Sequence, residues 1–298
     1  MLRIGHVDLG TTHPAKFIET ERELGHNPVG VFDDFRILSE EKARQFAVDN
    51  KVHFFDNLDD LAEHVDIACI HSVNWDLHLP KLLPFIKRGK GVYLDKPCCG
   101  NITDIHKIKS LVQDGAKITG CSMIGFTDDV KAITASTPNI HFAFAGGPNE
   151  VYYYGSHVYY LLGAILGYDF ARVRYLGSSA QKMFDIEWPS GKKAVIAIGD
   201  SPAKWFPFHI TLLSDAKPAQ HIINASLALK NMLTEVIPHL AGTASNMPAV
   251  SDLLNCELAA LAALQSEQTG GQFVELAQVT PSTHYDGTAY EKIYAKKS

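Results

Sequence analysis

The chain opens with Leu2-Arg3-Ile4-Gly5-His6-Val7-Asp8-Leu9-Gly10-Thr11-Thr12-His13-Pro14, which is a short apolar run followed by a turn and a proline. The run at residues 2–7 predicts a strand, and Pro14 suits the first position of a helix, where its missing N–H is not needed. Dinucleotide-binding turns carry glycine at three positions of G-x-G-x-x-G, so that backbone N–H groups meet the pyrophosphate. Here those positions hold Asp8, Gly10 and His13. The turn therefore predicts a strand-turn-helix unit, and it leaves open a structural loop that binds no nucleotide.

Short apolar runs alternate with amphipathic stretches up to residue 121, which favours right-handed βαβ units and a parallel sheet. Later strands follow one another without helices between them, which favours an antiparallel sheet. The length of 298 residues is about twice that of a common single domain. We therefore expect a dinucleotide-binding Rossmann domain at residues 1–122 and an α+β domain with an open, mostly antiparallel sheet at 123–298. One large domain is the alternative. The later elements expected are strands at 140–145, 173–178, 193–198, 208–213 and 219–225, and helices at 129–136, 156–166, 227–240 and 251–268.

Composition narrows the class of protein. A net charge of −6 argues against a nucleic-acid surface, which needs clustered Lys and Arg. The sequence has no apolar run long enough for a transmembrane helix, and its N-terminus reaches Asp8 too early for a signal peptide. The cysteines show no metal-ligand spacing, so we expect reduced thiols, a cytoplasmic location and no metal site. These cysteines are Cys69, Cys98, Cys99, Cys121 and Cys256.

The second predicted strand ends in Val31-Phe32-Asp33-Asp34. A carboxylate at that point, about 20 residues beyond the glycine turn, accepts hydrogen bonds from ribose hydroxyls and repels a 2′-phosphate. Asp33 therefore favours NAD over NADP, and an ordinary turn or helix cap is the alternative. Asp8 is expected to face the pyrophosphate unfavourably, because like charges repel.

Two further segments carry a family resemblance. The fourth predicted strand leads into Ser72-Val73-Asn74-Trp75-Asp76-Leu77-His78, and the fifth is Gly89-Lys90-Gly91-Val92-Tyr93-Leu94-Asp95-Lys96-Pro97. In order and spacing they resemble the Gfo/Idh/MocA oxidoreductases (glucose-fructose oxidoreductase, inositol dehydrogenase), with Asp95 in place of a glutamate. The cofactor residues this implies, together with the first turn, are Asp8, Leu9, Gly10, Thr11, Thr12, His13, Asp33, Ser72, Val73, Asn74, His78, Asp95, Lys96 and Pro97.

The resemblance implies that Lys96 lies between the nicotinamide and the substrate hydroxyl, and that His157 is the general base. The family's Asp-x-x-x-His has Tyr153 at the aspartate position, and Tyr160 stands at a second acidic position. We expect the phenol of Tyr153 to bond to the histidine ring or to the substrate instead, and Tyr152 and Tyr154 are the alternative donors. His157 is predicted in the first turn of a helix, where the helix dipole disfavours a protonated ring. The remaining histidines are interpreted as structural, and the aromatic residues Trp205, Phe206 and Phe208 as packing or oligomer contacts.

The resemblance implies an NAD-dependent dehydrogenase or reductase, with NADP as the second cofactor considered. Its substrate would be a sugar, cyclitol or related polyol, and the family's sheet face implies a homodimer or homotetramer. Two classes remain as alternatives. One is a catalytically inactive nucleotide-binding sensor or scaffold, and the other is an NAD-dependent elimination or glycoside-cleaving enzyme without net redox change.

Overall fold

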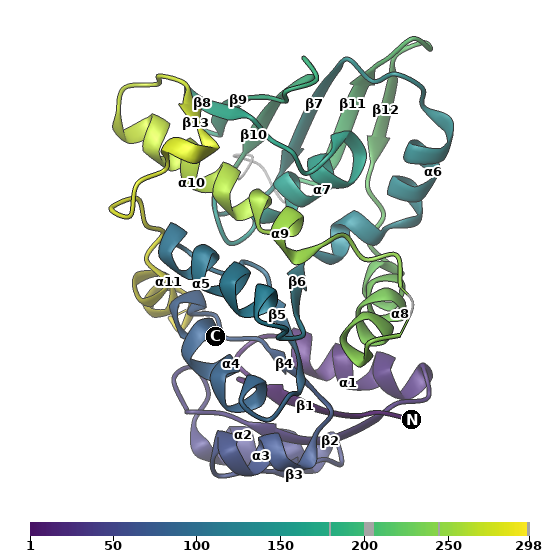
Figure 1. Cartoon of the computed structure of the whole chain (residues 1–298), viewed down its shortest axis with the longest axis vertical. Coiled ribbons are helices and arrows are strands. Elements are labelled where there is room, and N and C mark those ends of the chain that lie inside the picture. Colours follow the sequence, from purple (N-terminus) through teal and green to yellow (C-terminus); the bar gives the residue numbers. More distant parts are fainter. Residues whose placement is uncertain (179, 200–205, 244, 297–298) are drawn as a thin grey trace.

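Two β-sheets organise the chain, one in each half of the molecule (Figure 1). The computed structural model describes residues 1–178, 180–199, 206–243 and 245–296. All strands of the first sheet precede residue 122, and all strands of the second follow it. This is the predicted combination of a parallel Rossmann sheet and a second, mostly antiparallel sheet.

The first sheet has six parallel strands in the order β3-β2-β1-β4-β5-β6. Its strands are short and almost entirely apolar at β4 and β5, as expected of strands covered on both faces. Asn57 caps α3 as an exposed polar side chain, accepting from the N–H of Asp60. The elements are β1 (Arg3–Val7), α1 (His13–Glu23), β2 (Asn27–Phe32), α2 (Glu40–Asp49), β3 (His53–Phe54), α3 (Leu58–His64), β4 (Ile67–Ile70), η1 (Trp75–Leu77), α4 (His78–Ile86), β5 (Gly91–Asp95), α5 (Ile102–Gln113) and β6 (Ile118–Cys121).

The second sheet has seven strands in the order β12-β11-β7-β10-β9-β8-β13, and β7 and β10 form its one parallel pair among the described residues. The sequence prediction missed β9, which forms a hairpin with β8, and β13 at the sheet edge. It also joined α9 and α10 into one helix. The elements are η2 (Met123–Phe126), α6 (Asp128–Ser136), β7 (Phe142–Gly147), α7 (Ser156–Leu166), β8 (Arg172–Ser178), β9 (Lys182–Glu187), β10 (Lys193–Ile198), β11 (His209–Leu213), β12 (Ala219–Ile222), α8 (Ala228–Ala241), α9 (Val250–Leu253), α10 (Asn255–Gln268), β13 (Val274–Glu275), η3 (Leu276–Gln278) and α11 (Gly287–Tyr294).

The two halves are joined by more than the connection at residue 122. The helix α8 packs against α1 and β5, and α7 and α8 both pack against η2. The C-terminal segment returns from the second sheet to the first, so that α11 lies beside the Rossmann half (Figure 1). The sequence prediction contained no element after residue 268, so this return was missed.

The cysteines, the helices and three aromatic residues bear on the class of protein. All five cysteines are buried free thiols. Within the described ranges, no helix combines the length and apolar character needed to cross a bilayer. Of the predicted aromatic packing residues, Phe208 contacts His157 and Phe206 contacts His209, while Trp205 lies outside the described residues.

Candidate active site

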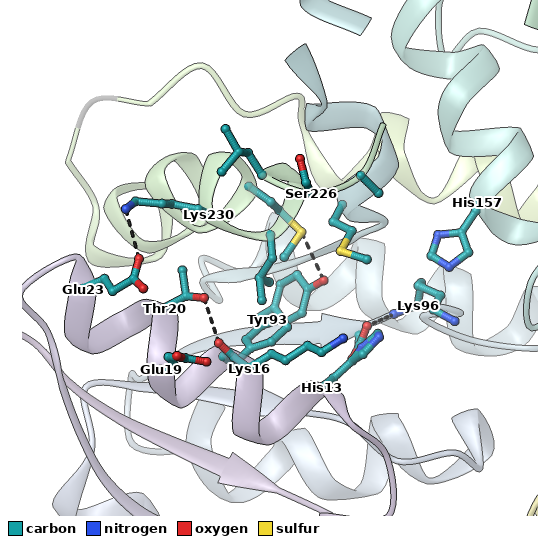
Figure 2. A pocket seen from close by; sticks show the side chains of 17 residues that line it. His13, Lys16, Glu19, Thr20, Glu23, Tyr93, Lys96, His157, Ser226 and Lys230 are labelled. Atoms are coloured by element: carbon teal, nitrogen blue, oxygen red, sulfur yellow. Dashed lines mark hydrogen bonds and ion pairs between the residues drawn. The ribbon is translucent and has the colours of Figure 1, made fainter. Parts of the chain in front are cut away.

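The predicted site lies at the carboxyl ends of the parallel strands. The chain order reverses between β1 and β4, and ligands of such sheets bind at this switch point. Asp8 follows β1, His71 follows β4, and β5 ends at Asp95 with Lys96 next to it. From the second half of the molecule, α7 places His157 against the same edge (Figure 2).

Two adjoining cavities of about 490 Å³ and 410 Å³ lie there. Figure 2 shows the side chains of His13, Lys96 and His157 converging at one end of the first cavity. Thr11 and Thr12 line the second. The residues shared by both walls are His13, Lys16, Lys96, Met123, His157 and Ala225. The structure therefore brings Lys96 and His157 together, as the family resemblance implies.

Lys96 is almost fully buried and is held by the second half of the molecule. Its Nζ donates to the carbonyl oxygen of Tyr153 at 3.0 Å and lies 3.6 Å from the centre of the Tyr153 ring. Burial lowers the pKa of Lys96 to about 8, against the opposing effect of Asp95 and Glu150. An amine in this range can hold a substrate oxygen as a cation or take part in proton transfer near neutral pH.

His157 is buried and bonds through Nδ1 to the Ser122 hydroxyl at 2.5 Å. Burial holds the pKa of His157 well below its usual range, and the positive charge of Lys96 lowers it further. The ring is thus neutral, as the helix position suggested, but burial is the main cause. Sequence reasoning missed Ser122, which lies 35 residues away on a different element.

Tyr153 is not the hydrogen-bond partner of His157. Its ring packs against Tyr290, with the centroids 4.8 Å apart, and against Trp75. The tyrosine ring that lies towards His157 is that of Tyr154, with centroids 6.5 Å apart. The expected bond between Tyr153 and the His157 ring is therefore wrong in this geometry. Tyr153 instead contacts Lys96 through its carbonyl oxygen and its ring face.

Tyr160, which stands at the second acidic position of the family, bonds to a buried glutamate. The Tyr160 hydroxyl donates to Glu257 of α10 at 2.9 Å, and Glu257 accepts the N–H of Cys98 at 3.1 Å. Burial raises the pKa of Glu257 to about 7. This pair braces the loop that follows Lys96, and no motif in the sequence pointed to it.

Asp8 does not face an open groove. Its carboxylate accepts from the Ser72 hydroxyl and from Lys81 Nζ at 2.6 and 2.7 Å, and Lys81 also pairs with Asp34 at 2.8 Å. The pKa of Asp8 is raised, because burial outweighs the effect of Lys81. Its φ of 65° is one that aspartate tolerates better than most side chains. The expected repulsion of a pyrophosphate is thus replaced by a structural ion pair that the sequence analysis missed.

Asp33 fastens the end of β2 to the first turn. Its two oxygens accept the N–H of Leu9 at 2.7 Å and of Phe35 at 2.6 Å. Burial raises the pKa of Asp33 to about 6. In the same turn, the hydroxyl of Thr11 accepts the N–H of His13 at 3.1 Å, whereas Thr12 makes no side-chain cap bond to α1.

The loop after β4 is braced from within. The His78 ring nitrogens lie 3.0 Å from the carbonyl oxygens of Cys98 and of Ser72, so the ring ties this loop to the Lys96 loop. Val73 and Pro97 are buried beside them. These three predicted cofactor residues therefore shape the loops at the site.

The C-terminal cover, defined as residues 284–296, crosses the predicted adenosine side of the groove. Arg36 donates to both oxygens of Glu291 at 2.7 Å, Asn74 donates to the Thr288 hydroxyl at 3.0 Å, and Trp75 donates to a backbone carbonyl of the cover at 2.6 Å. Asn74, a predicted cofactor residue, is thus engaged by the protein itself.

Residues of the types that bind a dinucleotide surround this side, but the space is filled. A Cβ at Gly10 would lie 2.6 Å from the Cβ of Ile37. The absence of a side chain at Gly10 therefore leaves room for the side chain of Ile37. The space bordered by Asp8, Gly10, Asp33 and Glu291 is only about 10 Å³, which is room for about one water molecule at most. The nicotinamide side has room for a ligand, and the adenosine side requires the cover to move.

Comparison with known proteins gives the family. Residues 4–122 match the family model of the Gfo/Idh/MocA oxidoreductases, described as an oxidoreductase family with an NAD-binding Rossmann fold. These residues therefore form an NAD-binding Rossmann domain of the Gfo/Idh/MocA type. No curated protein matches it by sequence.

Solved structures extend the Gfo/Idh/MocA likeness over the second half. The chain is similar to scyllo-inositol dehydrogenase from Lactobacillus casei with bound NAD(H) and scyllo-inositol, at a TM-score of 0.77 and 13% identity over 93% of this chain and 98% of that one. Similarity to the myo-inositol dehydrogenase of that organism has a TM-score of 0.78 at 12% identity over 92% and 96%. A UDP-N-acetylglucosamine 3-dehydrogenase from Acidithiobacillus ferrooxidans gives 0.73 at 14% identity over 89% and 96%. At these identities the likeness shows a shared fold over both halves of the chain.

Proposed function

We propose that the protein is an NAD-dependent oxidoreductase that acts on a hydroxyl or keto group of a sugar, cyclitol or related polyol. The observation that carries this proposal is Lys96, a buried amine with a pKa of about 8 at the wall of a cavity of about 490 Å³ that it shares with His157. The match of residues 4–122 to the model of an NAD-binding oxidoreductase family supports the reaction class. Similar folds bind NAD(H) with inositols, which supports the substrate class.

Each protein group has a defined task in this reaction. NAD, when bound, supplies the hydride acceptor. Lys96 orients the substrate oxygen, and His157, neutral and fixed by Ser122, offers a second polar contact from the opposite wall. Thr11 and Thr12 lie where the pyrophosphate would pass, and Asp33 would meet the ribose once the cover has moved.

Binding of both nicotinamide cofactors tests the first half of the proposal. Calorimetric titration is expected to show tighter binding of NAD than of NADP, because Asp33 repels a 2′-phosphate, and Asp33→Ala is expected to narrow the gap. A preference for NADP in the unchanged protein would contradict this assignment.

A panel of polyols and sugars tests the second half. We expect reduction of NAD to be detected as absorbance of the reduced nicotinamide with at least one cyclitol or sugar. Product formation without net reduction would instead indicate elimination or glycoside cleavage.

A catalytically inactive nucleotide-binding sensor is the second candidate. The tyrosines at two acidic positions of the family, Tyr153 and Tyr160, favour it, because the usual carboxylate partners of the histidine are absent. NAD binding without turnover across the whole panel would identify this class.

We also propose that the open face of the second sheet joins copies of the chain into a homodimer or homotetramer. Large apolar side chains are exposed on five of its strands, and a patch of this kind commonly marks an interface. They are Phe144, Leu176, Met183, Leu213 and Ile222. Light scattering with size-exclusion chromatography is expected to give a dimer or tetramer, and Leu213→Glu a smaller species. The free thiols fit the proposed cytoplasmic location.

A further inference from the structure

A chain of buried polar side chains runs behind the site through the first sheet. His13 Nδ1 lies 2.6 Å from Asp95 Oδ2, and His71 Nδ1 lies 2.9 Å from the same oxygen. His71 Nε2 lies 3.2 Å from His6 Nδ1, and His6 Nε2 lies 3.1 Å from Glu21 Oε2. Four of the five side chains are buried, and that of His13 is 23% exposed. The sequence analysis assigned His13 and Asp95 to cofactor binding and treated His6 as structural, and it did not connect these residues to one another.

The protonation of Asp95 and His71 sets the direction of the hydrogen bonds in this series of side chains. Burial opposes ionisation of Asp95, but the two imidazoles outweigh it and hold its pKa well below the usual range. Asp95 is therefore a carboxylate and accepts from both Nδ1 atoms. Burial lowers the pKa of His71 to about 4, so a neutral His71 carries its proton on Nδ1 and accepts at Nε2 from His6. The bond between His6 Nε2 and Glu21 Oε2 ends the series.

In the neutral form of the His13 ring, this direction leaves the other ring nitrogen, Nε2, without a proton. His13 forms part of the wall of both cavities, beside Lys96 and Lys16 and across from His157 (Figure 2). Its ring stacks on Phe17, with centroids 6.2 Å apart, so packing as well as the bond to Asp95 orients it. A neutral imidazole held by a carboxylate at Nδ1 is the arrangement that makes Nε2 a general base.

His157 has the opposite arrangement. The Ser122 hydroxyl oxygen already accepts the N–H of Ile124 at 3.1 Å, and its own proton is available for Nδ1 of His157. With Nδ1 accepting, the neutral His157 carries its proton on Nε2 and donates a hydrogen bond. Position 153 holds no carboxylate that could orient His157. At the other wall of the cavity, however, the carboxylate of Asp95 orients the ring of His13.

We propose that His13, oriented by Asp95, is the base that accepts the proton of the substrate hydroxyl, and that His157 donates a hydrogen bond to the same substrate. This inference rests on the proposed function. In the step, the O–H bond breaks and its proton moves to His13 Nε2. The C–H bond breaks with its electron pair passing to oxidised NAD, which is reduced, and the carbinol carbon becomes a carbonyl. Asp95, His71 and His6 are positioning residues.

The first test needs neither cofactor nor substrate. Nitrogen-15 NMR of histidine-labelled protein distinguishes the two neutral tautomers, with His13→Gln and His157→Gln identifying the signals. We expect a proton on Nδ1 of His13 and on Nε2 of His157. His141 is the internal control, because its Nε2 bonds to exposed Asp215 at 2.7 Å and should carry the proton. A proton on Nε2 of neutral His13 would overturn the inference.

Titration with Zn²⁺ tests a competing interpretation of the same side chains. One ligand atom each from His13, His71 and Asp95 lies within 4.8 Å of the others, which also suits a metal ion. The hydrogen bonds described above already satisfy these atoms, so we expect no stoichiometric binding that His13→Gln abolishes. Such binding would replace the base with a metal site.

Turnover on whichever polyol the panel identifies completes the test. His13→Gln is expected to lower kcat by roughly 10²-fold, the usual scale for general base catalysis, and to remove the acidic limb of the pH–rate profile. His157→Gln should keep that limb. Loss of the limb only in His157→Gln would return the base to His157. A panel with no turnover contradicts the proposed function, while the tautomers still decide how His13 is protonated.

Discussion

The two ends of the groove along the Rossmann sheet differ in how their charged groups are used. At the substrate end, Lys96, His13 and His157 face a cavity of about 490 Å³. At the adenosine end, Asp8 is paired with Lys81, Arg36 is paired with Glu291, and about 10 Å³ of space remains. Along this edge of the sheet, the polar groups at the substrate end face a cavity. Those at the adenosine end are paired with other protein groups. The difference shows that the Rossmann fold indicates where a ligand would bind without fixing which part of that groove is open.

Replacing Lys96 should have the largest effect and would break the comparison at its open end. Lys96→Ala is expected to lower kcat by roughly 10²-fold or more on a confirmed substrate, because an acid–base or orienting cation is lost. Steady-state kinetics measure this, and circular dichroism checks the fold. Lys193→Ala, an exposed lysine paired with Glu187 in the second sheet, is the matched control and should leave turnover unchanged. Near-normal turnover in Lys96→Ala would remove this residue from the mechanism.

Asp8 tests whether the closed end is a structural ion pair. Asp8→Asn is expected to lower the free energy of unfolding by about 2 kcal/mol, because Lys81 stays buried with Asp34 as its remaining partner. Denaturant titration measures the change, and Asp59→Asn, at an exposed ion pair with Arg88, is the control. An unchanged unfolding free energy would mean that the pair contributes nothing, and would restore Asp8 as a group facing the cofactor.

Weakening the C-terminal cover should open the adenosine end of the groove and so test whether the cover is what closes it. Glu291→Gln removes the charge that Arg36 holds, and NAD is expected to bind roughly fivefold more tightly, which corresponds to about 1 kcal/mol. Calorimetry measures the dissociation constant. Glu275→Gln, which lies before the cover, should leave NAD binding unaltered. Weaker NAD binding in Glu291→Gln would show that Glu291 contributes to the cofactor site itself.

The smallest expected effect concerns the brace behind the open end. The folded-state pKa of Glu257, about 7, exceeds its usual value of 4.5. Its contribution to stability is therefore present below pH 4.5 and is lost as pH rises through 7. Glu257→Gln is expected to remove this pH dependence and raise the melting temperature by a few degrees at pH 8, relative to the unchanged protein. Scanning calorimetry at pH 5 and pH 8 measures it, and an equal difference at both values would exclude this carboxyl as the cause.

The sequence predicted the parts of the site that depend on strand order. Lys96 and the first turn meet because parallel strands end at one edge, and His157 joins them through a family motif. Contacts set by side-chain direction between distant segments were not predictable, among them Lys81 with Asp8, Ser122 with His157 and His71 with His6. The helix α11 has eight residues, which is too few for a helix to be stable alone, so tertiary contacts stabilise it. The sequence analysis found no periodic pattern that predicts this helix.

The bond from Lys96 to the carbonyl of Tyr153 crosses between the two halves of the molecule. If the halves part, that carbonyl and the Tyr153 ring leave the amine, water replaces them, and its pKa returns towards 10.5 from about 8. Between these pH values, opening takes up a proton and closing releases one. Closure and proton release are then a single thermodynamic event, so alkaline conditions favour the closed form and the buffer exchanges a proton with each cycle of opening.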